Sequence, residues 1–215
     1  TEDEGKAMLM NFGVQIPAGT TVSEADARSQ AADFNYPVVL KMMSPNLAHK
    51  TEAGAVVLNI TGPNDLIDKI ACMKNTVKAY DMGAKTDSFL IEEMSPTPLA
   101  ELIVTLRSDP QFGSVLVLGS GGILTELVGD AVTVLLPATS KDIEQALQRL
   151  RTGKLLGGFR GRPKANFARI SDQIHKLCSS YVSHQSEIFE IEINPMFVYQ
   201  EDMVAIDALI QVVAS

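Results

Sequence analysis

The sequence predicts an α+β fold in which antiparallel hairpins alternate with helices. Short apolar, β-branched runs, which are typical of strands, are separated by segments with helical periodicity and N-capping residues. Several strands follow one another directly as hairpins, which disfavours a doubly wound parallel sheet. With 46% hydrophobic residues in a chain of 215, the protein can bury a substantial core. We therefore expect a two-lobed α+β body.

The first elements are expected before the proline-rich stretch at Pro96 and Pro98. Ser23 and Asp26 form a capping box that opens a helix to about residue 34. Asn64 is expected to cap a helix that ends near residue 80. The expected strands are residues 36–43, 54–60 and 88–94.

The second half of the chain is expected to contain two long helices and a larger set of strands. The helices are residues 170–182 and a segment capped by Ser140 that runs to about residue 151. The strands are residues 100–106, 114–118, 131–136, 188–199 and 203–206, followed by a short helix. Because Pro96 and Pro98 are the best candidates for a hinge between lobes, we expect one lobe at about 20–95 and the other at 1–19 plus 96–215.

The charge balance and the cysteine usage restrict the function. The 26 acidic and 18 basic residues give a net charge of −8, which disfavours a nucleic-acid partner because a phosphate-backbone binder needs a basic face. The two widely spaced cysteines, Cys72 and Cys178, fit a reducing compartment. Neither a signal peptide nor a run of about 20 apolar residues is visible, so we expect a cytoplasmic protein without a membrane span. The start at Thr1 rather than Met is compatible with a piece of a longer protein.

The C-terminal hairpin brings polar oxygens together. In the run EIFEIEINP, alternation places Phe189, Ile191 and Ile193 on one face and Glu190, Glu192 and Asn194 on the other. A turn centred on residues 200–201 would place Asn194 directly opposite Asp207. An amide and carboxylates on one sheet face suit Mg²⁺. A solvated polar face on an edge hairpin would explain the same pattern.

Three further features could contact an anion. The glycines of Gly119–Gly122 follow an apolar strand and could approach a phosphate, although a tight turn without a ligand is the commoner explanation. Lys41 interrupts the apolar run VVLKMM and needs either a phosphate or a neighbouring glutamate, unless it reaches water at a sheet edge. His49 and Lys50, in the following loop, could bind or relay a phosphoryl group, which most loop histidines do not do.

Taken together, several stretches resemble a known family over residues 4–212. They are YPVVLKMMSPNLAHKTEAGAVVLNI, LIEEMSPTPLAELIV, DPQFGSVLVLGSGGILTELVGD, GFRGRP and EIEINPMFV with MVAIDALI. They are similar to the ATP-grasp unit of ADP-forming acyl-CoA synthetases, the acetate–CoA ligases of the succinyl-CoA synthetase superfamily. The resemblance implies an ATP-grasp fold with a nucleotide cleft between two lobes.

The resemblance also implies residues for the nucleotide. Lys41 matches the lysine that contacts the nucleotide phosphates, and Lys50 would add a second phosphate contact. Glu93 and Glu101 match acidic positions around the adenosine and ribose. The backbone from Glu92 to Met94 would read the adenine edge.

The remaining matches concern the metal and the phosphoryl group. Asn194 and Asp207 match magnesium ligands, in agreement with the register derived above. Glu192 matches an acidic residue near the site of phosphoryl transfer to histidine. His49 matches a histidine that relays phosphate in the acetate-type enzymes. ATP or ADP with Mg²⁺ are thus the implied cofactors.

The reaction that the resemblance implies is acyl-CoA + ADP + phosphate ⇌ acid + CoA + ATP, by way of a phosphohistidine. The CoA-binding part is missing, so the implied partner is a CoA-binding α subunit or an N-terminal domain of the same chain. The rival interpretation is a non-catalytic regulatory module of a fused acyltransferase. Non-catalytic copies tend to lose the metal-binding hairpin. Because Glu192, Asn194 and Asp207 are all retained here, the catalytic interpretation is favoured.

Overall fold

A computed structural model describes residues 1–44, 47, 50–122 and 129–213. The chain forms two compact units, one made of Thr1 and Pro17–Pro96 and the other of Glu2–Ile16 and Thr97–Ser215. The last crossing from one unit to the other falls between Pro96 and Thr97, inside the proline-rich stretch. Each unit has its own sheet and its own hydrophobic core.

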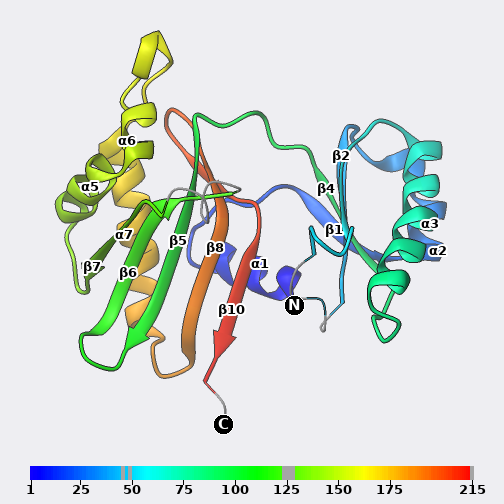
Figure 1. Cartoon of the computed structure of the whole chain (residues 1–215), viewed down its shortest axis with the longest axis horizontal. Helices are drawn as coiled ribbons and strands as arrows, with labels where there is room; N and C mark the ends of the chain where they lie inside the picture. Colours follow the sequence, from blue (N-terminus) through cyan, green and yellow to red (C-terminus); the bar gives the residue numbers. More distant parts are fainter. Residues whose placement is uncertain (45–46, 48–49, 123–128, 214–215) are drawn as a thin grey trace. The chain divides into compact units, whose positions relative to one another are not determined.

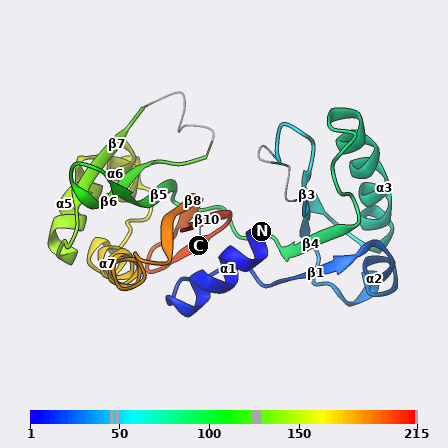
Figure 2. The same ribbon diagram turned by 90° about the horizontal axis from the view of Figure 1, so that it is seen from below.

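The first unit is a four-stranded antiparallel sheet with helices on one face (Figures 1 and 2). Its strands are β1 (Gly19–Ser23), β2 (Val38–Met42), β3 (Val56–Ile60) and β4 (Ser88–Glu93), in the order β1-β4-β2-β3. Its helices are α2 (Glu24–Ser29), the 3₁₀ turn η1 (Ala31–Asp33) and α3 (Pro63–Tyr80). Alternate residues of β2 and β4 pack with Leu66, Ile70 and Met73 of α3, as expected from helical and strand periodicity.

The second unit contains a larger antiparallel sheet. Its main path runs β10-β8-β5-β6-β7, and β9 also pairs with β8. The strands are β5 (Ala100–Asp109), β6 (Gly113–Ser120), β7 (Ala131–Leu135), β8 (Ile188–Val198), β9 (Met203–Ala205) and β10 (Ala208–Val212). The helices are α1 (Glu2–Asn11), α5 (Ser140–Arg149), α6 (Arg151–Leu156), the 3₁₀ turn η2 (Phe159–Gly161) and α7 (Phe167–Ser183).

One face of this sheet packs against α5, α6 and α7 (Figure 1). The core side of β5 and β8 is formed by Leu102, Val104, Ile191 and Ile193. The opposite face carries side chains of the other parity, and we call it the polar face: Thr105, Arg107, Glu190, Glu192 and Asn194. The polar face is where the sequence predicts the metal ligands.

The structure differs from the sequence prediction mainly at element ends. The segment after Asp207 is the strand β10 rather than a short helix, because it continues to pair with β8. Helix α3 begins after Gly62 with Pro63 in its first turn, so Asn64 is not its cap. The cap of α5 is Thr139 rather than Ser140. Among the elements of the described residues, α1, β1, α6 and the 3₁₀ turn η2 were not predicted.

The capping box at the start of α2 is partly as predicted. Ser23 is the N-cap, and its side chain accepts a hydrogen bond from the Asp26 amide nitrogen. The helix itself ends at Ser29, and the 3₁₀ turn η1 follows, so the regular helix is shorter than expected. No helix in the described part of the chain is both long enough and apolar enough to cross a bilayer.

Candidate functional site

The C-terminal hairpin has the register that the sequence predicts. Met196 lies opposite Ala205 in β9, and Ile193 lies opposite Ala208 in β10. Between these pairs the backbone N–H of Asn194 donates to the backbone carbonyl oxygen of Asp207 at 3.2 Å. Asn194 and Asp207 are therefore opposite one another, at the point where β9 gives way to β10.

The predicted alternation fails at the beginning of β8. The register of the β8–β10 pair shifts between Gln211 and Val212, so Val212 pairs with Ile188 rather than with Phe189. Ile188 is consequently buried, whereas Phe189 is 48% exposed. The prediction that Phe189 shares the core face with Ile191 is wrong, because a β-bulge changes the parity of the strand.

Glu101, the glycine turn and Asn194 meet on the second unit. The Gly122 amide nitrogen donates to Asn194 Oδ1 at 3.0 Å. A Cβ at Gly122 would overlap the Glu101 carboxylate, which is the movable end of a side chain, but φ +61° strains any other residue at this position. A Cβ at Gly121 would overlap the backbone of Leu102. Backbone packing thus accounts for Gly121, and the positive φ accounts for Gly122, without a ligand.

Asp130, which the sequence pattern did not single out, connects Ser120 of this turn to the start of α6. Its Oδ2 accepts hydrogen bonds from Ser120 Oγ at 3.0 Å and from the Arg151 amide nitrogen at 2.7 Å. The Ser120 amide nitrogen donates to the Asp130 carbonyl oxygen at 3.0 Å, and the Ser120 and Thr152 hydroxyls are also hydrogen-bonded. The sequence signal that could have identified Asp130 is an acidic residue shortly after a glycine-rich segment.

Glu192 lies in an environment that disfavours its ionised form. Partial burial raises the pKa of its carboxyl, and the charges of Glu190 and Asp207 raise it further. The effect of both neighbours indicates that each of their carboxylates is close enough to repel the carboxylate of Glu192. A cation at this position would relieve the repulsion.

The donors of this region fit a magnesium ion. Asn194 and Asp207 offer an amide oxygen and a carboxylate, which are hard ligands. Among the described residues, no group of three His, Cys, Asp or Glu side chains could hold a metal by itself. Mg²⁺ commonly takes only one or two protein ligands and completes its shell with water and phosphate oxygens, so two ligands from the hairpin are sufficient.

Lys41 in the first unit has a carboxylate partner. Its Nζ lies 3.0 Å from Glu92 Oε2, and the two side chains are only 5% and 3% exposed. The partner comes from the neighbouring strand β4, which pairs with β2 in antiparallel register. Of the explanations considered for a lysine in an apolar strand, a neighbouring glutamate is the one found here.

The backbone predicted to read adenine is hydrogen-bonded within the first unit. The Glu93 amide nitrogen donates to the Ala18 carbonyl oxygen at 2.8 Å, and that of Met94 donates to the Pro37 carbonyl oxygen at 3.1 Å. The exposed Glu93 side chain accepts a hydrogen bond from Asn35 Nδ2 at 2.8 Å. The sequence gives no sign of the Asn35 contact, because 58 positions separate the pair.

The loop after β2 is described only in part. His49 lies outside the described residues. Lys50 is half-buried, and its carbonyl oxygen accepts a hydrogen bond from the Ala55 amide nitrogen at 2.8 Å. The predicted residues thus fall into two groups. Lys41, Lys50, Glu92, Glu93 and Met94 belong to the first unit, and Glu101, Glu192, Asn194 and Asp207 belong to the second.

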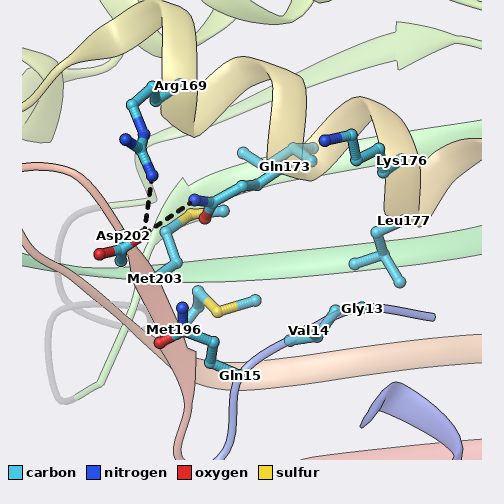
Figure 3. A pocket seen from close by; sticks show the side chains of 11 residues that line it. Gly13, Val14, Gln15, Arg169, Gln173, Lys176, Leu177, Met196, Asp202 and Met203 are labelled. Atoms are coloured by element: carbon cyan, nitrogen blue, oxygen red, sulfur yellow. Dashed lines mark hydrogen bonds and ion pairs between the residues drawn. The ribbon is translucent and has the colours of Figure 1, made fainter. Parts of the chain in front are cut away.

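A pocket of about 260 Å³ lies elsewhere in the second unit, between α7, the Gly13–Gln15 segment and the β8–β9 hairpin (Figure 3). Arg169 and Gln173 on α7 point toward Asp202, and both form hydrogen bonds with its Oδ1 (Figure 3). Among the described residues, none of those predicted to bind a nucleotide or a metal lines it. The pocket is therefore separate from the described site residues.

Comparison with known proteins defines the class. The sequence model of a family described as an ATP-grasp domain matches residues 1–212. The chain is 32% identical over 212 residues to the "Acetate--CoA ligase [ADP-forming] II subunit beta" of Pyrococcus furiosus, covering 97% of this chain and 89% of that subunit. The chain thus belongs to the ATP-grasp domain family, within which its relatives are β subunits of ADP-forming acetate–CoA ligases.

Other relatives are longer. The chain is 35% identical to a 4-hydroxybutyrate–CoA ligase (ADP-forming) of Nitrosopumilus maritimus over 93% of its own length, but it spans only 28% of that protein. The chain therefore corresponds to most of a subunit in one relative and to about a quarter of another.

Solved structures show the same fold. The acetyl-coenzyme A synthetase 1 of Ca. Korarchaeum cryptofilum, in complex with coenzyme A and Ca-AMPCP, superposes with a TM-score of 0.90 at 29% identity, covering 99% of this chain and 92% of that chain. A second structure of that enzyme contains Mg-AMPPCP, with the phosphohistidine segment pointing towards the nucleotide binding site; it superposes with a TM-score of 0.82 at 26% identity, covering 99% of this chain and 92% of that chain. The predicted ATP-grasp fold is thereby confirmed.

Proposed function

We propose that this chain is the nucleotide-binding and phosphoryl-transferring part of an ADP-forming acyl-CoA synthetase. The observation that carries the proposal is the hairpin in which Asn194 lies opposite Asp207, with Glu192 on the same face. The resemblance of the whole chain to β subunits of such ligases supports it. The partner would be a CoA-binding subunit or domain that carries the phosphohistidine.

In this proposal each unit has its own task. Lys41 and Lys50 of the first unit contact the nucleotide phosphates, and the segment from Glu92 to Met94 holds the adenine, with Glu93 near the adenosine. In the second unit, Glu101 contacts the ribose, while Asn194 and Asp207 hold magnesium.

Magnesium, Glu192 of the second unit and His49 of the first unit would act on the transferring phosphoryl group. Magnesium would offset negative charge on the nucleotide phosphates. Glu192 would orient the incoming phosphohistidine through a carboxylate–imidazole contact, and His49 would act as the relay residue of the acetate-type enzymes. Because the chemistry needs little beyond positioning and charge, the protein contributes mainly fixed cations and fixed hydrogen-bond donors.

Phosphoryl transfer to the CoA-binding partner tests the proposal. The full chain is incubated with Mg·ATP and the purified partner, and acid-labile phosphohistidine is measured. We expect Asp207→Ala to reduce the rate by about 100-fold or more, because the phosphate charge is no longer offset. Asp202→Ala, an acidic residue of the same hairpin that contacts Arg169, should transfer phosphate at the normal rate. His49→Ala tests the relay separately.

The alternative function is a non-catalytic regulatory module of a fused acyltransferase. It predicts nucleotide binding without phosphohistidine formation, and equal behaviour of the wild-type chain and Asp207→Ala in the transfer assay. That outcome would replace the catalytic proposal.

A further inference from the structure

The ion pair between Lys41 and Glu92 lies on the sheet face opposite α2 and α3. Val38, Leu40 and Met42 alternate with Lys41 along β2 and pack in the core. Val39 lies opposite Glu92 in the β2–β4 pair, and Lys41 shares the face of Val39, so the two charged residues are diagonal neighbours. The pair is formed across two strands whose register is fixed by the core on their other face.

Strand β1 fixes the position of the carboxylate from the other side. Gly19 lies directly opposite Glu92 in the β1–β4 pair. A Cβ at Gly19 would lie 2.6 Å from Glu92 Cγ and 2.7 Å from the carbonyl oxygen of Ile91. The Glu92 side chain thus occupies space that is left by the missing side chain of Gly19, which gives that glycine a steric function.

We propose that Glu92 is a positioning residue whose carboxylate holds the buried Lys41 ammonium ready for the phosphates of the nucleotide. The inference rests on the proposed function, which assigns Lys41 to those phosphates, and it adds a side-chain role for Glu92, whose backbone alone was expected to contact the nucleotide. An ammonium carries three N–H donors, so Lys41 can keep Glu92 and still donate to a phosphate oxygen.

The proposal predicts the sign of a mutational effect. If Glu92 were merely a negative charge near the phosphates, its removal would strengthen the binding of a polyanion. If it holds Lys41, its removal leaves a buried ammonium without this partner and less firmly positioned, and nucleotide binding weakens. Glu92→Gln keeps the size of the side chain and removes only the charge, so it separates the two possibilities.

The experiment measures the Kd of Mg·ADP by calorimetry on the full chain. We expect Glu92→Gln to raise the Kd about tenfold, which corresponds to the free energy of one good contact. The matched control is Glu24→Gln in the same unit, which removes one charge and breaks the ion pairs of Glu24 with Lys74 and Arg28. The control should bind Mg·ADP as the wild type does.

A double-mutant cycle shows whether Glu92 acts through Lys41. Lys41→Met should weaken binding, and the further change Glu92→Gln should then cost nothing more. With the CoA-binding partner present, Glu92→Gln should raise the KM for ADP while leaving kcat at saturating nucleotide within about twofold of wild type. If Glu92→Gln does not fold, Glu92→Asp, which withdraws the carboxylate by one methylene, replaces it with the same expected direction.

The outcomes separate this inference from the proposed function. A wild-type chain that does not bind Mg·ADP, or a Lys41→Met chain that binds it unchanged, overturns the nucleotide site and the inference with it. Equal or tighter binding by the Glu92 variant, in a chain whose binding depends on Lys41, overturns only the positioning role. A full additional loss of Mg·ADP affinity when Glu92→Gln is added to Lys41→Met would also overturn only the positioning role.

Discussion

At the scale of single residues, the environment decides what a carboxylate contributes. Glu92 and Glu192 both lie on strands and both match positions of the same family, yet their surroundings differ. Glu92 is buried against the Lys41 ammonium, whereas Glu192 is partly buried beside two other carboxylates. The sequence shows two glutamates in similar strands, and only their neighbours in the folded sheet separate a paired charge from a repelled one.

Replacement of Glu192 by Gln should stabilise the chain at neutral pH. The carboxyl has a pKa that is higher in the folded than in the unfolded chain, so its favourable contribution is complete at low pH and is lost as the pH rises through the folded-state pKa. We expect Glu192→Gln to raise the thermal midpoint by about 2 °C at pH 7 and to have little effect near pH 4.

Thermal unfolding followed by circular dichroism at the two pH values measures this difference. Glu187, an exposed residue just before β8, provides the control. Glu187→Gln should leave the thermal midpoint unchanged at both pH values. A gain of equal size at both pH values would contradict an electrostatic origin.

At the scale of elements, the hydrogen-bonding partner of a cap matters more than its residue type. Thr139 and Ser140 are both good N-caps, but the structure uses Thr139, whose Oγ1 accepts a hydrogen bond from the Asp142 amide nitrogen at 3.2 Å. Asp142 Oδ2 returns the interaction by accepting from the Thr139 amide nitrogen at 2.9 Å. The acidic residue three positions along therefore selects the cap.

Removal of this cap should destabilise the second unit. We expect Thr139→Ala to lower the free energy of unfolding by about 1 kcal/mol, because α5 loses the partner of a first-turn amide. Ser140→Ala, one residue later, should stay within about 0.5 kcal/mol of wild type. Urea denaturation measures both changes. If Ser140→Ala lost more free energy of unfolding than Thr139→Ala, the cap would instead be Ser140, as predicted from the sequence.

At the scale of the whole molecule, the chain consists of two units with separate cores. The prolines indicated the crossing after Pro96. The N-terminal segment Glu2–Ile16 belongs to the second unit because Leu9 packs in the core of that unit. In the proposed function, the net charge of −8 is compatible with a nucleotide ligand, because Lys41 and the hairpin would supply local sites for phosphate and metal.

Binding of the nucleotide should stabilise the whole chain, and removal of the metal should reverse the effect. At a concentration of Mg·ADP about 100 times its Kd, linkage predicts about 2.7 kcal/mol of stabilisation, or roughly 5–10 °C in the thermal midpoint. Excess EDTA with the same ADP should abolish most of the shift. Differential scanning fluorimetry measures it, and an unchanged midpoint with Mg·ADP would argue against a nucleotide site.

Local sequence patterns predicted much of the architecture because they are strong signals. The α+β class, most strands and the long helices follow from periodicity, and the Asn194–Asp207 pairing follows from a turn position and a constant register. The prediction failed at β10 and at Phe189. In both cases the sequence prediction rested on a local preference, and the pairing between β8 and β10 decided the outcome.

What the sequence determined by itself is therefore the set of main elements and the family, and it supplied the residues that we propose for the nucleotide and the metal. What only the tertiary structure decided is which groups meet: Glu92 with Lys41, Gly122 with Asn194, and Asp130 with Ser120. The physical reason is that periodicity acts over a few residues, whereas these contacts join segments 10 to 72 positions apart and depend on sheet order and close packing.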